Sequence, residues 1–143
     1  MAYNVYSITD CKVELGHPDV GRAHIHQCGH GKITISSAGD LTSHTMTADG
    51  YVVVNKLTST NGTITMEIPQ NGQLDEFFVH WIGWQKKCDP SRIALGVLTI
   101  QDLAGGFTVT CTGVTIQKMP DRAFDRTATN RVITLLATTI TEQ

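Results

Sequence analysis

The 143-residue chain has a formal net charge of −2, and only 17% of its residues are charged, against about 25% in a typical globular domain. Thr occurs 20 times, and Ile, Val and Thr together account for 43 residues, a composition that favours strands over helices. These values exclude a disordered chain, a coiled coil and a helical bundle, and the lack of excess positive charge argues against an electrostatic nucleic-acid binder. We expect a single domain over residues 1–143 that is mainly β with one helix.

The sequence shows no signal for export or for insertion in a membrane. Its first residues lack a basic segment followed by an apolar one, and no window approaches 18 apolar residues, so we expect neither a leader peptide nor a membrane span. Four cysteines never form a C-x-x-C pair, and we expect them to be reduced and mostly buried. They are Cys11, Cys28, Cys88 and Cys111.

The N-terminal third of the chain predicts three strands and then a long polar segment. Alternating apolar residues favour strands over 3–15, 22–28 and 32–36, with a turn at 16–19 where Gly and Pro occur together. Residues 37–50 are polar and follow no regular period. Connectors of this length are usually functional or become ordered on binding, so we expect an irregular binding loop here.

The middle of the chain carries a strong hairpin signal. Two β-type runs, 51–57 and 63–68, flank Asn61 and Gly62, and an Asn-Gly pair between such runs is typical of a tight hairpin turn. We therefore expect these two strands to pair with each other.

One segment changes its period from two to about 3.6 residues, which predicts an amphipathic helix over 72–86. We expect Asn71 to cap its start, while Asp75 and Glu76 in the first turn suit the helix dipole. The apolar stripe is typical of a helix packed on a sheet, although Trp84, off the centre of the stripe, would also fit a subunit contact. The stripe comprises Leu74, Phe77, Phe78, Trp81 and Ile82.

The C-terminal third predicts a second hairpin and a final strand. Residues 94–101 and 107–118 read as paired strands around the Ala-Gly-Gly turn at 104–106, and residues 131–141 read as one long strand. Both faces of this last strand carry apolar side chains. We expect it to be covered on both sides or to lie at a subunit contact.

A metal site is the first chemistry to consider, because His24, His26, Cys28 and His30 alternate along a predicted strand and so share one face. Four such residues span about 20 Å, so only neighbouring pairs could chelate one ion. The alternative is an exposed polar strand face with one buried thiol, and we favour it. No metal, cofactor or cofactor-binding residue is expected.

Catalytic chemistry is not indicated by any other motif. Asp40, Ser43 and His44 lie close in sequence, but no nucleophile elbow such as G-x-S-x-G surrounds a serine. The paired carboxylates of a glycosidase and the glycine-rich start of a phosphate-binding loop are also missing from the sequence. We expect no catalytic residue and therefore a structural or binding protein, not an enzyme.

Taken in order, several segments resemble the tail tube proteins of long-tailed phages and prophages, above all those with contractile tails. Each segment is short, and the ordered set carries the resemblance over most of the chain. The segments are 1–7, 10–13, 44–56, 61–65, the helix that contains Trp81, 114–121 and 133–137.

This resemblance implies a β-sandwich or barrel-like subunit, flanked by the helix, that forms rings. Six copies would close into a ring whose strands join into one inner barrel, and rings would stack into a tube through which DNA passes at genome ejection without specific binding. The segment 37–50 would then contact the neighbouring ring. Its interface residues would be Asp40, Leu41, Thr42, His44, Thr45, Met46, Asp49 and Tyr51.

The resemblance also implies partners and a location. The chain would bind copies of itself, the tail sheath, the baseplate and the tail terminator, with no membrane involved, and it would be a virion tail component assembled in the cytoplasm of the bacterial host. Two alternatives stay open. One is another virion β-domain, such as a tail terminator, baseplate or connector protein, and the other is a small metal- or ligand-binding β-barrel.

Overall fold

The computed structural model describes residues 11–24, 33–70, 72–102, 106–124, 126–127 and 130–143. The parts of the first two expected strands that fall within 3–10 and 25–28 therefore lie outside the described residues.

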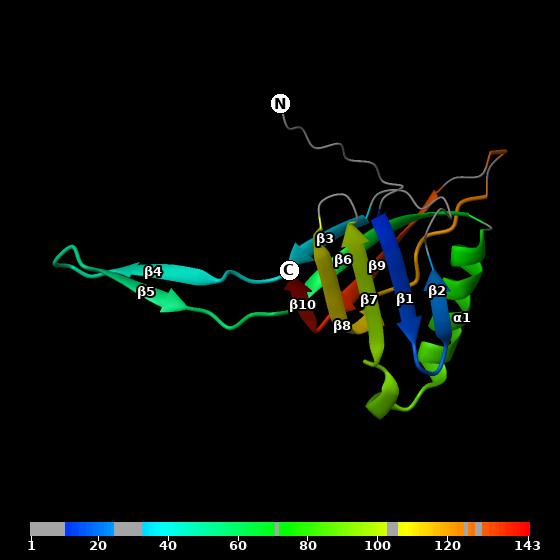
Figure 1. Cartoon of the computed structure of the whole chain (residues 1–143), viewed down its shortest axis with the longest axis horizontal. Coiled ribbons are helices and arrows are strands. Elements are labelled where there is room, and N and C mark those ends of the chain that lie inside the picture. The colour runs from blue at the N-terminus through cyan, green and yellow to red at the C-terminus, as the bar shows by residue number, and fades with distance from the viewer. Residues whose placement is uncertain (1–10, 25–32, 71, 103–105, 125, 128–129) are drawn as a thin grey trace.

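Within these residues the chain forms an eight-stranded antiparallel sheet, a separate strand pair and one long helix (Figure 1). The strand order is β2-β1-β7-β8-β9-β6-β3, with β10 also paired to β8, while β4 pairs with β5 alone. The predicted fold class, mainly β with one α-helix, is confirmed. The bounds are β1 (Cys11–His17), β2 (Gly21–His24), β3 (Ile33–Ser37), β4 (Thr42–Met46), β5 (Val52–Lys56), β6 (Gly62–Pro69), α1 (Gln73–Lys87), the short helix η2 (Pro90–Arg92), β7 (Gly96–Asp102), β8 (Thr108–Ile116), β9 (Asn130–Ala137) and β10 (Thr139–Glu142).

One face of the sheet forms the core, because its strands alternate apolar and polar residues with a period of two. In β6, Ile64, Met66 and Ile68 are fully buried, whereas the residues between them are only half-buried. The helix α1 packs on this face and buries Phe78 and Trp81 completely. The remaining core residues come from β1, β7, β8 and β9: Val13, Leu15, Leu98, Cys111, Val114, Ile116, Ile133, Leu135 and Ala137.

The predicted helix is confirmed with a shift of one residue at each end. Its N-cap residue is Gly72, and no side chain caps the first turn; Asn71, the expected cap, lies outside the described residues. Asp75 in the first turn is buried rather than solvated. In the described part of the chain, no helix is long and apolar enough to cross a bilayer.

The expected hairpin between 51–57 and 63–68 is wrong. β5 pairs with β4, and β6 lies between β3 and β9 in the sheet. Gly62 is not a turn residue: it pairs with Ala137, and a Cβ at this position would collide with the carbonyl oxygen of Ser36 and with Ile140. The glycine is needed because neighbouring chain segments approach its backbone closely. The Asn-Gly pattern alone cannot distinguish this role from that of a hairpin turn.

The second predicted hairpin is confirmed as β7 and β8. The expected last strand is also present, but it is interrupted at Thr138, so that β9 and β10 pair with successive parts of β8. The interruption lies opposite Gly113, which has φ +65°. Thr138 bridges the gap by donating its N–H to Thr112 O at 3.0 Å and its hydroxyl to Gly113 O at 3.1 Å.

Substitution of Gly113 by alanine should destabilise the subunit. Its φ is in the left-handed region, and the added Cβ would meet Thr138 Oγ1, so we expect the free energy of unfolding in urea to fall by about 1–3 kcal/mol. Gly83→Ala is the matched control, because Gly83 lies in α1 with open space around it. This change should raise the free energy of unfolding by about 0.5–1 kcal/mol. Equal effects of the two changes would contradict this account.

Candidate interaction surfaces

Strands β4 and β5 form an arm that projects from the body of the protein, on the side away from α1 (Figure 1). We use "the arm" for residues 41–57. At its base Leu57 N–H donates to Leu41 O at 2.9 Å, and at its tip Thr47 N–H donates to Tyr51 O at 2.8 Å. Gly50, with φ +86°, closes the tip turn.

Large apolar side chains of the arm are exposed. Leu41, Met46 and Tyr51 are 72%, 74% and 75% exposed, and all five residues of β4 are exposed. A two-stranded ribbon on its own is marginally stable in water, and clustered exposed apolar residues mark surfaces that bind other molecules. The arm is therefore a surface built to be covered.

The expectation of an irregular loop over 37–50 is wrong for Thr42–Met46, which forms β4. Alternation did not reveal this strand because both of its faces are exposed, and its residues are mostly polar. The eight predicted interface residues nevertheless lie together on the arm or at its base, and all are exposed: Asp40, Leu41, Thr42, His44, Thr45, Met46, Asp49 and Tyr51.

The second strand of the arm carries residues that sequence reasoning missed. Val52, Val53 and Val54 in β5 are exposed by 48%, 48% and 62%, and Leu57 at the base is also exposed. Three consecutive β-branched residues were a usable signal, because such a run makes both faces of a strand apolar.

The base of the arm is held by the edge of the sheet and not by the core. Ala38 N–H donates to Asn61 O, and Ile140 N–H of β10 donates to Thr60 O, each at 3.0 Å. Gly39 lies so close to Ser59 that a Cβ would come within 2.6 Å of the Ser59 hydroxyl oxygen. The direction of the arm thus depends on a few contacts at its root.

The outward face of the sheet, opposite α1, is poor in charge and partly apolar. Val97, Val132 and Leu136 on this face are 42%, 49% and 39% exposed. They are surrounded by threonines, since Thr65 pairs with Thr134 and Thr63 with Leu136. The expected covering of the last strand on both sides is not found among the described residues, because the outward face of β9 stays exposed.

A hollow of about 590 Å³ lies at the β2 end of this outward face. Glu14, Arg22, Val97 and Thr99 line it from β1, β2 and β7, and Leu95 adds an apolar wall. The sheet order begins with β2 and ends with β3. The hollow and the arm, which follows β3 in the chain, therefore belong to opposite ends of the sheet.

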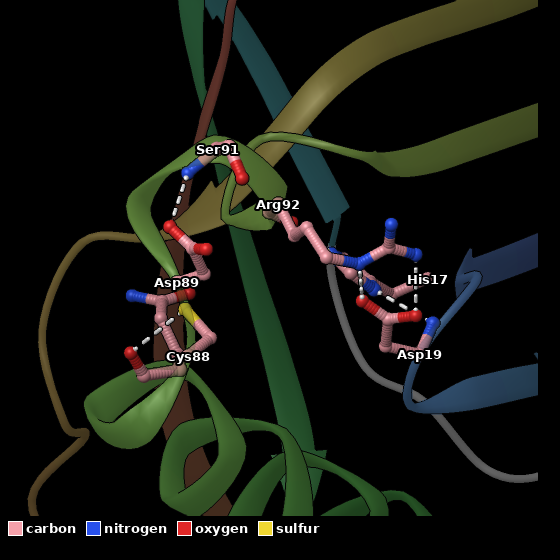
Figure 2. Close-up of polar contacts among 7 residues, drawn as sticks. His17, Asp19, Cys88, Asp89, Ser91 and Arg92 are labelled. Carbon is pink, nitrogen blue, oxygen red and sulfur yellow. Dashed lines mark hydrogen bonds and ion pairs between the residues drawn. The ribbon is translucent and has the colours of Figure 1, made fainter.

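His17, which lines this hollow, belongs to a hydrogen-bonded cluster with Asp19 and Arg92 that we call the lock (Figure 2). Arg92 donates to both oxygens of the Asp19 carboxylate, at 2.6 Å from Nε and 2.7 Å from Nη2. Asp19 N–H donates to Nδ1 of the buried His17 at 3.1 Å, so His17 Nε2 carries the proton and donates to Arg92 O at 3.0 Å. The His17 ring packs 4.3 Å from the ring of Trp84, which places Trp84 against this lock.

Electrostatics strengthens the lock. The hydrogen bonds from Arg92 lower the pKa of Asp19 below its ordinary value of 3.8, and the same carboxylate raises the pKa of Arg92. The carboxylate is therefore ionised at neutral pH and ties the β1–β2 turn to the connection between α1 and β7.

A second polar cluster is buried at the other end of α1. The Asp75 carboxylate accepts hydrogen bonds from Arg131, which is 4% exposed, and from Arg122 at 3.0 Å. Arg131 also donates to the backbone carbonyl oxygen of Pro120 at 3.0 Å. This cluster pins the segment after β8 between α1 and β9, and it does not form a reactive site.

The predicted histidine cluster receives no support from the described residues. His26, Cys28 and His30 lie outside them, and His24 is placed only as a backbone position in β2. Within the described part of the chain, no group of three or more His, Cys, Asp or Glu could hold a metal ion.

The thiols of two cysteines differ in their surroundings. Cys88 and Cys111 are free thiols, and the Cys88 thiol donates to Gln85 O at 3.2 Å (Figure 2). Burial raises the pKa of Cys111 from 9.0 to about 11. Cys111 therefore stays protonated at neutral pH and is a core residue, not a nucleophile.

Comparisons with known proteins agree with this geometry. The family described as "Bacteriophage PhiTE tail tube protein" matches residues 3–142. A comparison with curated protein sequences finds no match.

Solved structures share the fold at low sequence identity. A chain of the sheath/tube terminator of the extracellular contractile injection system PVC is similar with a TM-score of 0.64 and 15% identity, covering 100% of this chain and 99% of that one. A chain of the PVC sheath-tube complex gives 0.60 and 16%, covering 96% and 90%. A chain of the anti-feeding prophage baseplate, a 6-fold symmetrised structure, gives 0.58 and 8%, covering 100% and 97%.

The lock should respond to pH. A carboxyl whose pKa is lowered by folding stabilises the folded state when ionised, and that contribution is lost as the pH falls through the lowered pKa. Wild-type protein should therefore have a higher melting temperature than Asp19→Asn above about pH 5, and the difference should shrink as the pH falls through the lowered pKa of Asp19. In an Arg92→Gln background the Asp19→Asn change should have little further effect. A pH-independent difference between wild type and Asp19→Asn would contradict the assignment.

Proposed function

Because the chain belongs to the bacteriophage PhiTE tail tube protein family, we propose that copies of it close into rings and that the rings stack into a tail tube. The chain is a structural component of a phage tail and not an enzyme, as the family and its structural neighbours indicate. The proposal concerns how this structural protein assembles.

The observation that carries the proposal is the exposed arm. A contact between two different surfaces of identical subunits generates a ring if the rotation closes and a filament if it does not. The arm projects far from the sheet (Figure 1) and exposes Met46 and Tyr51 at its tip. Such a segment reaches beyond its own subunit, so we assign it the contact with the neighbouring ring.

The two edge strands supply the contact within a ring. β2 and β3 lie at the two ends of the sheet order, and open strand edges pair readily with other strands. Pairing β2 of one copy with β3 of the next would join the sheets into a continuous barrel. We propose six copies per ring, in keeping with the 6-fold symmetrised baseplate assembly that contains a similar fold.

The outward face of the sheet would then line the lumen. This face carries threonines and few charges, and six subunits of net charge −2 would give each ring a charge of −12. DNA would meet no basic wall and could pass without binding, since phosphate contacts with Lys and Arg dominate DNA affinity.

Other tail proteins would complete the assembly. The fold recurs in chains of a sheath-tube complex and of a baseplate, so we propose that the tube binds a tail sheath, a baseplate and a tail terminator. Assembly would take place in the cytoplasm of the bacterial host.

A second candidate function is that of a terminator that caps a tube with a single ring. It is favoured by the similarity to the PVC sheath/tube terminator, which extends over 100% of this chain. The two functions differ in one observable. A tube protein elongates with rising concentration, whereas a terminator stops at one ring.

Negative-stain microscopy of the concentrated protein tests this proposal. We expect rings and tubes with a central hole for the wild type. The double change Met46→Ser with Tyr51→Ser should raise the concentration needed for tubes by at least about 100-fold, because each lost burial costs about 1.5–3 kcal/mol. Phe124→Ser is the matched control, because Phe124 is 87% exposed but lies off the arm.

The outcomes separate the alternatives. Tubes that depend on the arm residues but not on Phe124 support the tube function. Single rings at every concentration would assign the terminator function, and a strict monomer would overturn both. If tube formation is unchanged by the two arm substitutions, the arm does not make the contact between rings that we assign to it.

A further inference from the structure

We propose that the bend of β8 at Gly113, together with the side chain of Thr138, sets the number of copies that close a ring. The inference rests on the proposed ring assembly, and it names the residues that fix the angle between neighbouring subunits. The group to which we assign this role is the exposed hydroxyl of Thr138.

Strand β8 joins two parts of the sheet. Residues 109–112 of β8 pair with β10 and residues 108–114 face β7, whereas only Thr115 and Ile116 pair with β9. β1 and β2 continue the sheet beyond β7, and β6 and β3 continue it beyond β9. In Figure 1 the strands β6 and β9 run obliquely to β1 and β7. The sheet therefore changes direction within β8.

The change of direction coincides with a β-bulge. Gly96 pairs with Val114 and Val97 pairs with Thr112, so Gly113 is an extra residue on β8. A bulge bends its strand and increases the local twist, and a glycine in the left-handed region is common in it. Gly113 has φ +65°. We call this bulge the corner, because it lies between the two parts of the sheet.

Thr138 braces the corner from the opposite side of β8. Its N–H donates to Thr112 O at 3.0 Å, and its hydroxyl donates to Gly113 O at 3.1 Å. Its own carbonyl oxygen accepts a hydrogen bond from the Thr60 hydroxyl at 3.3 Å. The side chain is exposed, so hydrogen bonds and not core packing define its place. The hydroxyl thus ties the interruption between β9 and β10 to the bulged residue.

The angle at the corner determines how the two edge strands of a subunit are oriented. β2 ends the part of the sheet that contains β7, and β3 ends the part that contains β9. If β2 of one copy pairs with β3 of the next, the rotation between neighbours follows from the angle between these edges. Six copies require a rotation of about 60°, and a change of about 10° would favour five or seven copies instead. A small change at the corner is therefore enough to alter the ring.

Counting the copies in each ring tests the proposal. Thr138→Ala removes the bracing hydroxyl from an exposed position, so the subunit should still fold. For the wild type we expect rings of one size in end-on class averages and in native mass spectrometry. In Thr138→Ala the share of rings with another copy number should rise by about five-fold or more, which is the effect of one net hydrogen bond on an equilibrium.

Two matched variants control for the loss of a threonine. Thr138→Ser keeps the hydroxyl and should form rings of the wild-type size. Thr141→Ala removes an exposed threonine hydroxyl from β10 at a position away from the bulge, and it should also leave the copy number unchanged. Melting curves of all variants check that each subunit is folded.

The outcomes separate this inference from the ring function itself. Altered or mixed copy numbers in Thr138→Ala, with wild-type rings in both controls, would support the corner as the element that sets ring size. Rings of wild-type size in Thr138→Ala, an equal change in either control, or loss of assembly without rings of another size would overturn it and leave the ring function standing. A wild type that forms no rings would overturn both.

Discussion

A single helix can cover only one face of a wide sheet, and this constraint shapes the rest of the molecule. α1 has 15 residues and is therefore about 22 Å long and 10 Å across, whereas the path from β2 to β3 contains seven strands and is about 30 Å wide. Within the described residues no second layer covers the outward face. The low charge and the many threonines of this face suit the channel wall that we propose for it.

Ionic contacts fix the helix at both of its ends. Asp75 in the first turn is held by Arg131 of β9, and the connection after the last turn is held to the β1–β2 turn through Arg92 and Asp19. The first pair is buried and would leave a costly unpaired charge if either partner were lost. The second is partly exposed to solvent and therefore contributes less to stability than the first. Between them, the stacked rings of Phe78 and Trp81 fill the core.

The sequence predicts an element correctly where its local residue pattern agrees with the burial of those residues in the fold. The stripe of α1 and the alternation of β7 and β8 each place apolar residues on the one face that the core requires, so their period predicts them. Prediction from the sequence failed where the role of a residue depends on a contact with a residue far away in the chain. Asn61 and Gly62 match the pattern of a hairpin turn, but Gly62 lies in β6, where a side chain would collide with Ser36 O and Ile140. Likewise, Arg131, the partner of Asp75, lies 56 residues away in the sequence. The interface residues that we propose on the arm were suggested by the resemblance, whereas their strand was missed because neither of its faces is buried.

The slender root of the arm has a consequence for the mechanics of an assembled tube. The body of each subunit is a closely packed sheet and helix, but the arm is joined to it through Gly39 and a few hydrogen bonds near Asn61 and Thr60. If rings are coupled through such arms, stiffness resides in the rings and compliance in the joints. A tube of this kind would bend by small changes of angle at each root, without deforming the wall of its channel.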